Sequence, residues 1–528
     1  MSHPIRIYVA ALAWIASAGV AAHSAETCAD LSKLQLPATS ITKAEAVAAG
    51  TFQPPKGAAI QNLPAFCRVA GVIKPSSDSN IEFEVWMPAA DWNGKFQGVG
   101  NGGFAGEISY GGLGVALAGH YATASTDTGH EAGGTDATWA LDHPEKITDF
   151  GYRAIHETAV QAKAILQAFY GAAAKRSYFS SCSNGGRQAL MEAQRYPADY
   201  DGIIAGAPAN YWTHLLSNAA WDELALTGTP GSYIPAKKLR AIQNAALAAC
   251  DTLDGVKDGV IENPPECHFD PGVLLCKGED SDTCLTAPQV TALKKLYAGG
   301  SNSHGRIFPG YSPGGEADPA GWAPWITGGS PEHSLMYAFG TQFFKNMVFD
   351  NAAWDYHTFN ADRDTRLADQ KQSRNLNSNN PDLARFRARG GKLIIYHGWS
   401  DAAIAPQNTV DYYSQVRAKM GAQKADSFVR LFMVPGMQHC GGGAGPNNFG
   451  QFSVATGDPD SNVDAALERW VEQGVAPERL IAVKHKSDMD PKSPVVRSRP
   501  LCAYPLVAHY KGAGSTDDAA NFECAKHD

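Results

Sequence analysis

Two features that would point to a zinc site or to nucleic acid are missing from the sequence. The ten cysteines include no C-x-x-C pair, the close spacing that zinc sites built on cysteine commonly use. Basic residues are few, since 44 Lys and Arg stand against 53 Asp and Glu, and the formal net charge is −9. Surfaces that bind nucleic acid are basic. The composition therefore argues against both a cysteine zinc site and a nucleic-acid partner.

Long apolar runs are also scarce. At the N-terminus, Arg6 precedes an apolar core at residues 7–22, and small residues follow it. This order is typical of a secretory signal peptide, and the core is too short for a membrane span. We expect residues 1–25 to be a signal peptide cleaved after Ala22 or Ala25. The protein is then periplasmic or secreted, without a membrane anchor; a buried N-terminal helix is the alternative.

Internal repeats and low-complexity segments are absent from the 528 residues, of which 44% are hydrophobic. A chain of this length and composition can bury a large core and suggests about two domains. Ten cysteines in an exported chain suggest a disulfide framework. Spacing does not fix the connectivity, but four local pairs are attractive: Cys28–Cys67, Cys250–Cys267, Cys276–Cys284 and Cys502–Cys524.

Residues 178–209 contain the pattern of a nucleophile elbow. A β-rich run turns sharply at Ser183, and a helical run follows at residues 187–195. Such a strand–turn–helix lifts a serine hydroxyl above the sheet edge, and small residues let helix and strand approach closely. Ser181 replaces the first glycine of the usual G-x-S-x-G. Taken alone, the motif leaves a nucleophile and an ordinary turn serine equally open.

An acid and a histidine follow this serine. A short apolar strand at residues 392–398 precedes a turn with Asp401, and a second strand at residues 428–434 precedes His439. The order Ser, Asp, His along the chain is that of α/β-hydrolases. These residues are therefore candidates for a catalytic triad.

Cysteines flank two of the three candidates. Cys182 immediately precedes the serine, and Cys440 immediately follows the histidine. If the hydroxyl and the imidazole lie within hydrogen-bonding reach, the two cysteines are close enough to form a disulfide. With its Cys-Ser pair, distant Asp and His-Cys pair, the chain resembles the tannase and feruloyl esterase family of α/β-hydrolases from about Cys28 to Cys524.

The resemblance implies an α/β-hydrolase fold with a triad of Ser183, Asp401 and His439. It also implies five disulfides, namely the four local pairs together with Cys182–Cys440. The family hydrolyses esters of plant phenolic acids, so a small aromatic ester is the expected substrate, and feruloyl or other hydroxycinnamoyl esters are favoured. Galloyl esters are one alternative, and the mono(2-hydroxyethyl) terephthalate hydrolases of the same family suggest another.

A glycine-rich loop at residues 100–106 follows a short strand at residues 95–99. It has neither G-x-G-x-x-G nor P-loop spacing. In an α/β-hydrolase this loop supplies one oxyanion donor, and the amide after the nucleophile supplies the other. We expect the backbone N–H groups of Gly103 and Asn184 to form the oxyanion hole, with Gly102 as the neighbouring alternative to Gly103.

Other stretches before the serine read as ordinary structure. Residues 67–73 and 81–87 alternate as antiparallel strands do. Residues 120–130 carry two histidines and an acid, which permits a metal site. A strand followed by a capped turn is the preferred interpretation, with Asp127 accepting local backbone hydrogen bonds.

The hydrolase pattern stops after residue 209 and resumes near residue 389, a gap longer than any ordinary connection. We expect residues 210–375 to form an inserted lid domain, and residues 26–209 with 376–528 to form the catalytic domain. The insert concentrates aromatic residues, most of which we expect in the core of the lid itself. A few should contact the substrate, and we select Trp325, Phe339 and, outside the lid, Ile404.

Terephthalate monoester hydrolysis is disfavoured by two departures from the family pattern. The related hydrolases recognise a free carboxylate with a lid arginine, and the corresponding stretch, residues 334–340, contains none. Where they carry an aromatic residue three positions after the catalytic Asp, this chain has Ile404.

Residues 250–260 of the insert carry Asp251, Asp254 and Asp258 among glycines. Three such acids repel one another unless a cation lies among them, and carboxylates mixed with backbone carbonyls suit Ca²⁺. The EF-hand spacing is absent. The resemblance implies a calcium ion in the lid, held by these three side chains and by the carbonyls of Val256 and Val260. We expect a structural ion; a solvated acidic loop is the alternative.

The C-terminal part is expected to contain a helix at residues 463–472 and then an irregular tail pinned by Cys502–Cys524. A non-catalytic, calcium-stabilised binding protein on a hydrolase scaffold is the remaining alternative function. The three intact triad residues disfavour it. The sequence does not indicate the oligomeric state.

Overall fold

The computed structural model describes residues 1, 26–453, 455, 457–488, 490 and 492–526. The predicted signal peptide lies outside the described residues, apart from Met1. Within the described part of the chain, no helix combines the length and the apolar character that crossing a membrane requires.

A nine-stranded sheet forms the centre of the molecule, in the order β1-β4-β5-β7-β6-β8-β9-β12-β13. From β7 to β13 neighbouring strands are parallel, whereas β1, β4, β5 and β7 pair antiparallel. The strands are β1 (Thr39–Val47), β4 (Phe66–Ile73), β5 (Ile81–Pro88), β6 (Lys95–Val99), β7 (Ala122–Thr126), β8 (Arg176–Cys182), β9 (Gly202–Gly206), β12 (Lys392–Gly398) and β13 (Val429–Val434). The predicted α/β-hydrolase fold and the predicted antiparallel pair β4–β5 are confirmed.

The central strands are buried on both faces, as strands of a parallel sheet usually are. Phe179 of β8 and Ile203 of β9 point into one core, with α3 and α11, whereas the adjacent Tyr178 and Ile204 point into another, with α13. Successive side chains alternate across a sheet, so one strand serves both cores. The helices outside the insert are α1 (Tyr110–Ala118), α2 (Pro144–Thr148), α3 (Ala154–Tyr170), α4 (Asn184–Arg195), α10 (Ala384–Ala388), α11 (Gln407–Met420), α12 (Ala422–Asp426) and α13 (Val463–Gln473).

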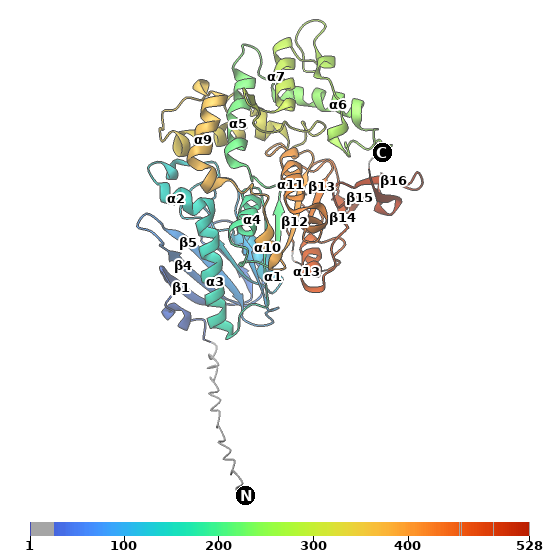
Figure 1. Cartoon of the computed structure of the whole chain (residues 1–528). Coiled ribbons are helices and arrows are strands. Elements are labelled where there is room, and N and C mark those ends of the chain that lie inside the picture. The colour runs from blue at the N-terminus through green and yellow to red at the C-terminus, as the bar shows by residue number, and fades with distance from the viewer. Residues whose placement is uncertain (2–25, 454, 456, 489, 491, 527–528) are drawn as a thin grey trace.

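The chain leaves this sheet after β9 and returns at β12, although the two strands are neighbours. Residues 210–376 of the segment between them, called the insert below, add no strand to the nine-stranded sheet, and the helices of this insert gather at one end of the sheet (Figure 1). Its elements are α5 (Trp212–Thr227), α6 (Leu239–Cys250), α7 (Ala287–Ala298), β10 (Ser301–Asn302), β11 (Gly305–Arg306), α8 (Leu335–Phe343) and α9 (Ala361–Leu376). The domain limits 210–375 stay a prediction.

The C-terminal tail is more regular than expected. β14 (Arg479–His485) pairs with β15 (Val495–Cys502), and β16 (Val507–Tyr510) pairs with β17 (Phe522–Ala525). The expectation of an irregular tail is wrong, because burial along β15 does not alternate and because β16 and β17, with four residues each, are too short to show a pattern. A further short pair, β2 (Gly50–Phe52) and β3 (Ile60–Leu63), precedes β4.

Five disulfides join the ten cysteines. They are Cys28–Cys67, Cys182–Cys440, Cys250–Cys267, Cys276–Cys284 and Cys502–Cys524.

Candidate active site

Ser183 lies in the tight turn between β8 and α4, with φ 67° and ψ −126°. Residues with a side chain rarely adopt positive φ, and such strain concentrates at functional sites. The packing beneath the turn requires glycine, because a Cβ at Gly186 would lie 2.2 Å from the carbonyl oxygen of Gly206. The absent side chain lets α4 approach the end of β9.

Asp401 and His439 reach the serine from the loops after β12 and β13. Ser183 Oγ lies 2.9 Å from His439 Nε2, and Asp401 Oδ2 lies 2.8 Å from His439 Nδ1. An ionised carboxylate only accepts hydrogen bonds, so Nδ1 donates to it and Nε2 accepts from the serine hydroxyl. In this tautomer the imidazole can remove the serine proton.

The surroundings of Asp401 keep it ionised. Its side chain is buried, and Oδ1 accepts the backbone N–H groups of Ala403 at 2.7 Å and Ile404 at 2.9 Å. Burial by itself raises the pKa of Asp401. The charge of His439 and the hydrogen bonds from His397 and His439 outweigh burial, and the pKa lies below its usual value.

His397 was missed by the sequence analysis. It is fully buried in β12, and its Nε2 lies 3.0 Å from Asp401 Oδ2. A histidine inside an otherwise apolar strand, four residues before the candidate acid, was the available signal. Two imidazoles therefore face one carboxylate oxygen.

The glycine-rich loop is fixed against α4. Gly103 and Asn184 line one cavity together with Ser183, and Asn184 is the first residue of α4, where backbone N–H groups have no partner within the helix. Gln188 accepts from the Asn101 amide N–H at 3.1 Å and donates to Asn101 Oδ1 at 2.8 Å. This double contact, which the sequence did not suggest, holds the loop beside the nucleophile.

Arg187 is a buried cation beneath the same turn. Its guanidinium donates to Asn184 Oδ1 at 2.7 Å and to the carbonyls of Gly151 at 2.8 Å and Phe150 at 3.0 Å. A bond to the Leu376 carbonyl at 3.3 Å reaches the end of α9. Burial lowers the pKa of Arg187 to about 9. The Arg187 side chain thus joins α4 to the insert and orients the side-chain amide of Asn184.

The cavity above Ser183 encloses about 410 Å³, part of it open to solvent. The three predicted substrate-contacting residues, Trp325, Phe339 and Ile404, all line it. The Trp325 ring lies edge-on to the His439 ring at 5.0 Å. The complete lining is Gly103, Ser183, Asn184, Ala209, Trp212, Leu215, Leu216, Trp325, Met336, Phe339, Ala403, Ile404 and His439. This set of described residues includes no lysine and no arginine.

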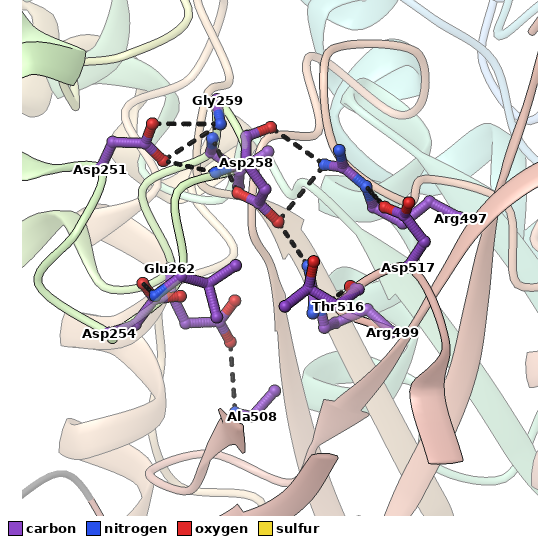
Figure 2. Close-up of polar contacts among 12 residues, drawn as sticks. Asp251, Asp254, Asp258, Gly259, Glu262, Arg497, Arg499, Ala508, Thr516 and Asp517 are labelled. Atoms are coloured by element: carbon purple, nitrogen blue, oxygen red, sulfur yellow. Dashed lines mark hydrogen bonds and ion pairs between the residues drawn. The ribbon is translucent and has the colours of Figure 1, made fainter. Parts of the chain in front are cut away.

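The predicted calcium ligands lie in one turn-rich loop after α6, and Figure 2 shows the three acids among them, Asp251, Asp254 and Asp258. Asp251 Oδ1 accepts from the amides of Asp258 at 3.2 Å and Gly259 at 3.1 Å, and Asp254 Oδ1 accepts from the amide of Val256 at 3.0 Å. Burial raises the pKa of Asp254 and that of Asp258. Three carboxylates beside backbone carbonyls form an oxygen-rich donor set that suits a hard cation.

Two arginines of β15 also reach this loop, as Figure 2 shows. Arg499 forms an ion pair with Asp258, and Arg497 lies 3.3 Å from the same carboxylate. Groups of three Asp, Glu, His or Cys ligand atoms within 4.8 Å of one another occur elsewhere in the described residues, not in this loop. Asp258 is therefore paired with the two arginines, and the carboxylates of the loop do not converge on one point.

Glu262 is a further acid beside the loop that the sequence analysis missed. It accepts from the Ala508 amide at 3.2 Å, which connects the insert to β16. Burial raises the pKa of Glu262 to about 8. The acidic loop is thus tied to the C-terminal strands by Glu262 as well as by the arginines.

A disulfide connects the serine and histidine segments directly. Cys182 and Cys440 lie 258 residues apart in sequence, and their Cα atoms lie 6.1 Å apart. The bond holds the end of β8 against the loop that carries His439.

Comparison with known proteins agrees over most of the chain. The family model described as "Tannase and feruloyl esterase" matches residues 67–525. An uncharacterized esterase of Xanthomonas campestris is 44% identical over 546 residues, covering 98% of this chain and 95% of that protein. A probable feruloyl esterase B-2 of Aspergillus terreus is 35% identical over 477 residues, covering 89% of this chain and 88% of that protein.

Solved structures are similar as well. Feruloyl esterase B from Aspergillus oryzae has a TM-score of 0.87 at 32% identity, covering 94% of this chain and 99% of that chain. Tannin acyl hydrolase from Aspergillus niger has a TM-score of 0.75 at 23% identity, with 95% of each chain covered. The latter likeness shows a shared fold.

Proposed function

The chain belongs to the tannase and feruloyl esterase family of carboxylic ester hydrolases, and on this premise we propose that it is an exported serine esterase for aromatic acid esters. Feruloyl and other hydroxycinnamoyl esters are the favoured substrates. The observation that carries the proposal is the hydrogen-bonded line from Ser183 through His439 to Asp401 at an apolar cavity.

The proposed reaction is acyl transfer through the serine. His439 takes the hydroxyl proton as Ser183 Oγ attacks the ester carbonyl, and Asp401 stabilises the resulting imidazolium. The backbone N–H groups of Asn184 and Gly103 hold the oxyanion, and the loss of one such donor typically costs about 3 kcal/mol in the barrier. The imidazolium then protonates the leaving alcohol. Water attacks the acyl-enzyme by the same steps and releases the acid.

The cavity supports a flat, uncharged acyl group. Trp325 and Phe339 stack with ring centroids 6.4 Å apart, and both belong to the lining. Binding sites for such groups are mostly apolar with few polar groups. A free carboxylate would find no cationic partner among the described lining residues, which argues against the terephthalate monoester. Galloyl esters remain the second candidate, because the family model that matches residues 67–525 describes tannases as well as feruloyl esterases.

We also propose a structural calcium ion in the loop after α6. The side chains of Asp251, Asp254 and Asp258 and the carbonyls of Val256 and Val260 would hold it. The support is the donor set, since three carboxylates at residues 251, 254 and 258 beside backbone carbonyls are the oxygen ligands that Ca²⁺ prefers. The ion would fix this loop, while ester hydrolysis is assigned to the protein side chains alone.

The test of the esterase proposal is the Ser183→Ala variant. Hydrolysis of methyl ferulate should fall by roughly 10⁶ in kcat, as for other serine triads, while the melting temperature stays near that of the wild type. Comparing kcat/KM for methyl ferulate, methyl gallate and mono(2-hydroxyethyl) terephthalate identifies the substrate class. Full activity in Ser183→Ala would assign the reaction to another nucleophile. A wild type that turns over none of the esters would favour the non-catalytic binding protein.

A further inference from the structure

His397 contacts the carboxylate of Asp401, the acid of the candidate triad. It is fully buried in β12, whereas Asp401 lies in the turn that follows this strand. His397 Nε2 lies 3.0 Å from Asp401 Oδ2 and 3.0 Å from the carbonyl oxygen of Ile404. Its other ring nitrogen, Nδ1, lies 2.7 Å from the hydroxyl oxygen of Thr409, which is buried in α11. Every polar atom of this imidazole therefore has a partner.

The partners determine where the proton lies. The carboxylate of Asp401 and the carbonyl of Ile404 can only accept hydrogen bonds, so Nε2 of His397 carries a hydrogen and donates it. The Thr409 hydroxyl can donate or accept, and it satisfies Nδ1. The assignment follows from the chemistry of the neighbours and needs no observed hydrogen.

Asp401 consequently has no free acceptor position toward its neighbours. Oδ1 accepts two backbone amides, those of Ala403 and Ile404, and Oδ2 accepts two imidazole N–H groups. Because the two amides hold one oxygen and His397 holds the other, the orientation of the carboxylate plane does not depend on His439. A carboxylate that cannot rotate holds the His439 ring in the orientation that the serine requires.

We propose that His397 is a positioning residue for the esterase reaction, acting through Asp401 on His439. This inference rests on the proposed function. His397 donates to the oxygen that also accepts from His439 and so withdraws part of its negative charge. The carboxylate then orients His439 without binding the imidazolium so tightly that the return of the proton is slowed.

Loss of the His397 donor should raise the pH at which His439 becomes an effective base. Without the His397 donor, Asp401 Oδ2 has more charge to offer, and the imidazolium form of His439 is stabilised. The neutral, proton-accepting form then appears only at higher pH. Tyr311 of the insert is a further titratable group that interacts electrostatically with Asp401; it donates to Asp222 at 3.0 Å, and burial raises the pKa of both groups. Because the pKa of Tyr311 lies well above its usual value, its phenol is uncharged over the working range and leaves the direction unchanged.

The experiment compares pH profiles of kcat/KM for methyl ferulate in His397→Leu, His397→Gln and the wild type. In His397→Leu, kcat should fall about ten- to hundredfold, as expected for one lost hydrogen bond to a charged group, with KM nearly unchanged. Its acid limb should move up by about one pH unit. In His397→Gln, the amide N–H replaces the imidazole donor, so the acid limb should return to the wild-type position.

A second pair of variants keeps the test open if His397→Leu does not fold. Thr409→Val removes the hydroxyl that supports His397 and should shift the acid limb in the same direction by less. Thr365→Val is the matched control, because Thr365 is also buried and its hydroxyl has no partner among the described residues. An unchanged acid limb in His397→Leu or, failing that, in Thr409→Val would overturn the positioning role. If the wild type itself does not hydrolyse the ester, the esterase proposal is overturned instead.

Discussion

Ser183 and the glycines around it show how single residues build the candidate site. The positive φ of Ser183 is held by a turn whose flanking strand and helix pack too closely for side chains at certain positions. At Gly186 the obstacles to a Cβ are backbone atoms, the carbonyl oxygen of Gly206 at 2.2 Å and Cα of Pro208 at 2.9 Å. Backbone atoms cannot move aside as a flexible side chain can. Gly186 of the Ser-Asn-Gly-Gly sequence is therefore a steric requirement as well as part of a motif.

The variant Gly186→Ala tests this requirement. The added methyl group should force α4 away from β9, lower the stability by about 1–3 kcal/mol as overpacking typically does, and reduce kcat by displacing the serine. Thermal unfolding and ester turnover would be measured together. The control is Gly111→Ala in α1, where an added Cβ meets nothing within 4 Å; it should leave kcat unchanged and raise the melting temperature slightly. Equal behaviour of the two variants would contradict the steric argument.

At the scale of elements, the loop that carries His439 is held from two directions. The disulfide Cys182–Cys440 attaches it to the end of β8. On the other side, Gln438 donates to the Gly315 carbonyl at 2.8 Å and to Asp318 at 3.1 Å, both in the insert. The insert therefore supports the histidine loop as well as one wall of the cavity.

Removal of this disulfide should impair both stability and turnover. The double variant Cys182→Ala/Cys440→Ala should lose about 2–5 kcal/mol of stability, the usual range for a native disulfide. Its kcat should fall at least about tenfold, because small misplacements of catalytic groups are costly. The matched control is Cys502→Ala/Cys524→Ala, which opens the β15–β17 link and removes no residue that lines the cavity. That variant should melt lower and keep its kcat. A fall in kcat of similar size in both would mean that the effect is one of general stability.

At the scale of the whole molecule, the insert and the C-terminal strands meet at the acidic loop. Asp258 accepts a hydrogen bond from Arg499, which lies 241 residues away in the sequence. Glu262 accepts one from the backbone N–H of Ala508, which lies 246 residues away. These contacts tie the insert to β15 and β16 beside the proposed ion. Anything that fixes the loop should therefore stabilise the attachment of the insert.

Chelation of calcium should consequently lower the melting temperature. A ligand present at 100 times its dissociation constant stabilises by about 2.7 kcal/mol, and calcium re-addition after EDTA treatment should restore that contribution. Differential scanning calorimetry with EDTA and with added Ca²⁺ measures the difference. Asp254→Asn should abolish the calcium response, whereas Asp270→Asn, an exposed acid of the insert paired with Lys294, should retain it. An identical midpoint with and without chelator would leave the loop as an ion-free acidic turn.

The sequence by itself determined the fold class and the places of the reacting groups. Strands that end in turns, with Ser183, Asp401 and His439 within about five residues of those ends, are local patterns, and parallel strands bring their carboxyl ends to one sheet edge. Trp325, Phe339 and Ile404 were selected from aromatic content and family resemblance, and they line the cavity.

Only the tertiary structure decided what supports these groups. Arg187 finds its acceptors at Phe150, Gly151 and Leu376, His397 meets Asp401 through a turn, and Arg499 reaches Asp258. None of these contacts has a periodic or compositional signal. They form when segments far apart in the chain, or on either side of a turn, are packed together, and a buried polar group then takes whichever partner the packing supplies. The order of side chains can be read from the sequence, whereas the hydrogen bonds that hold them depend on how distant segments pack together.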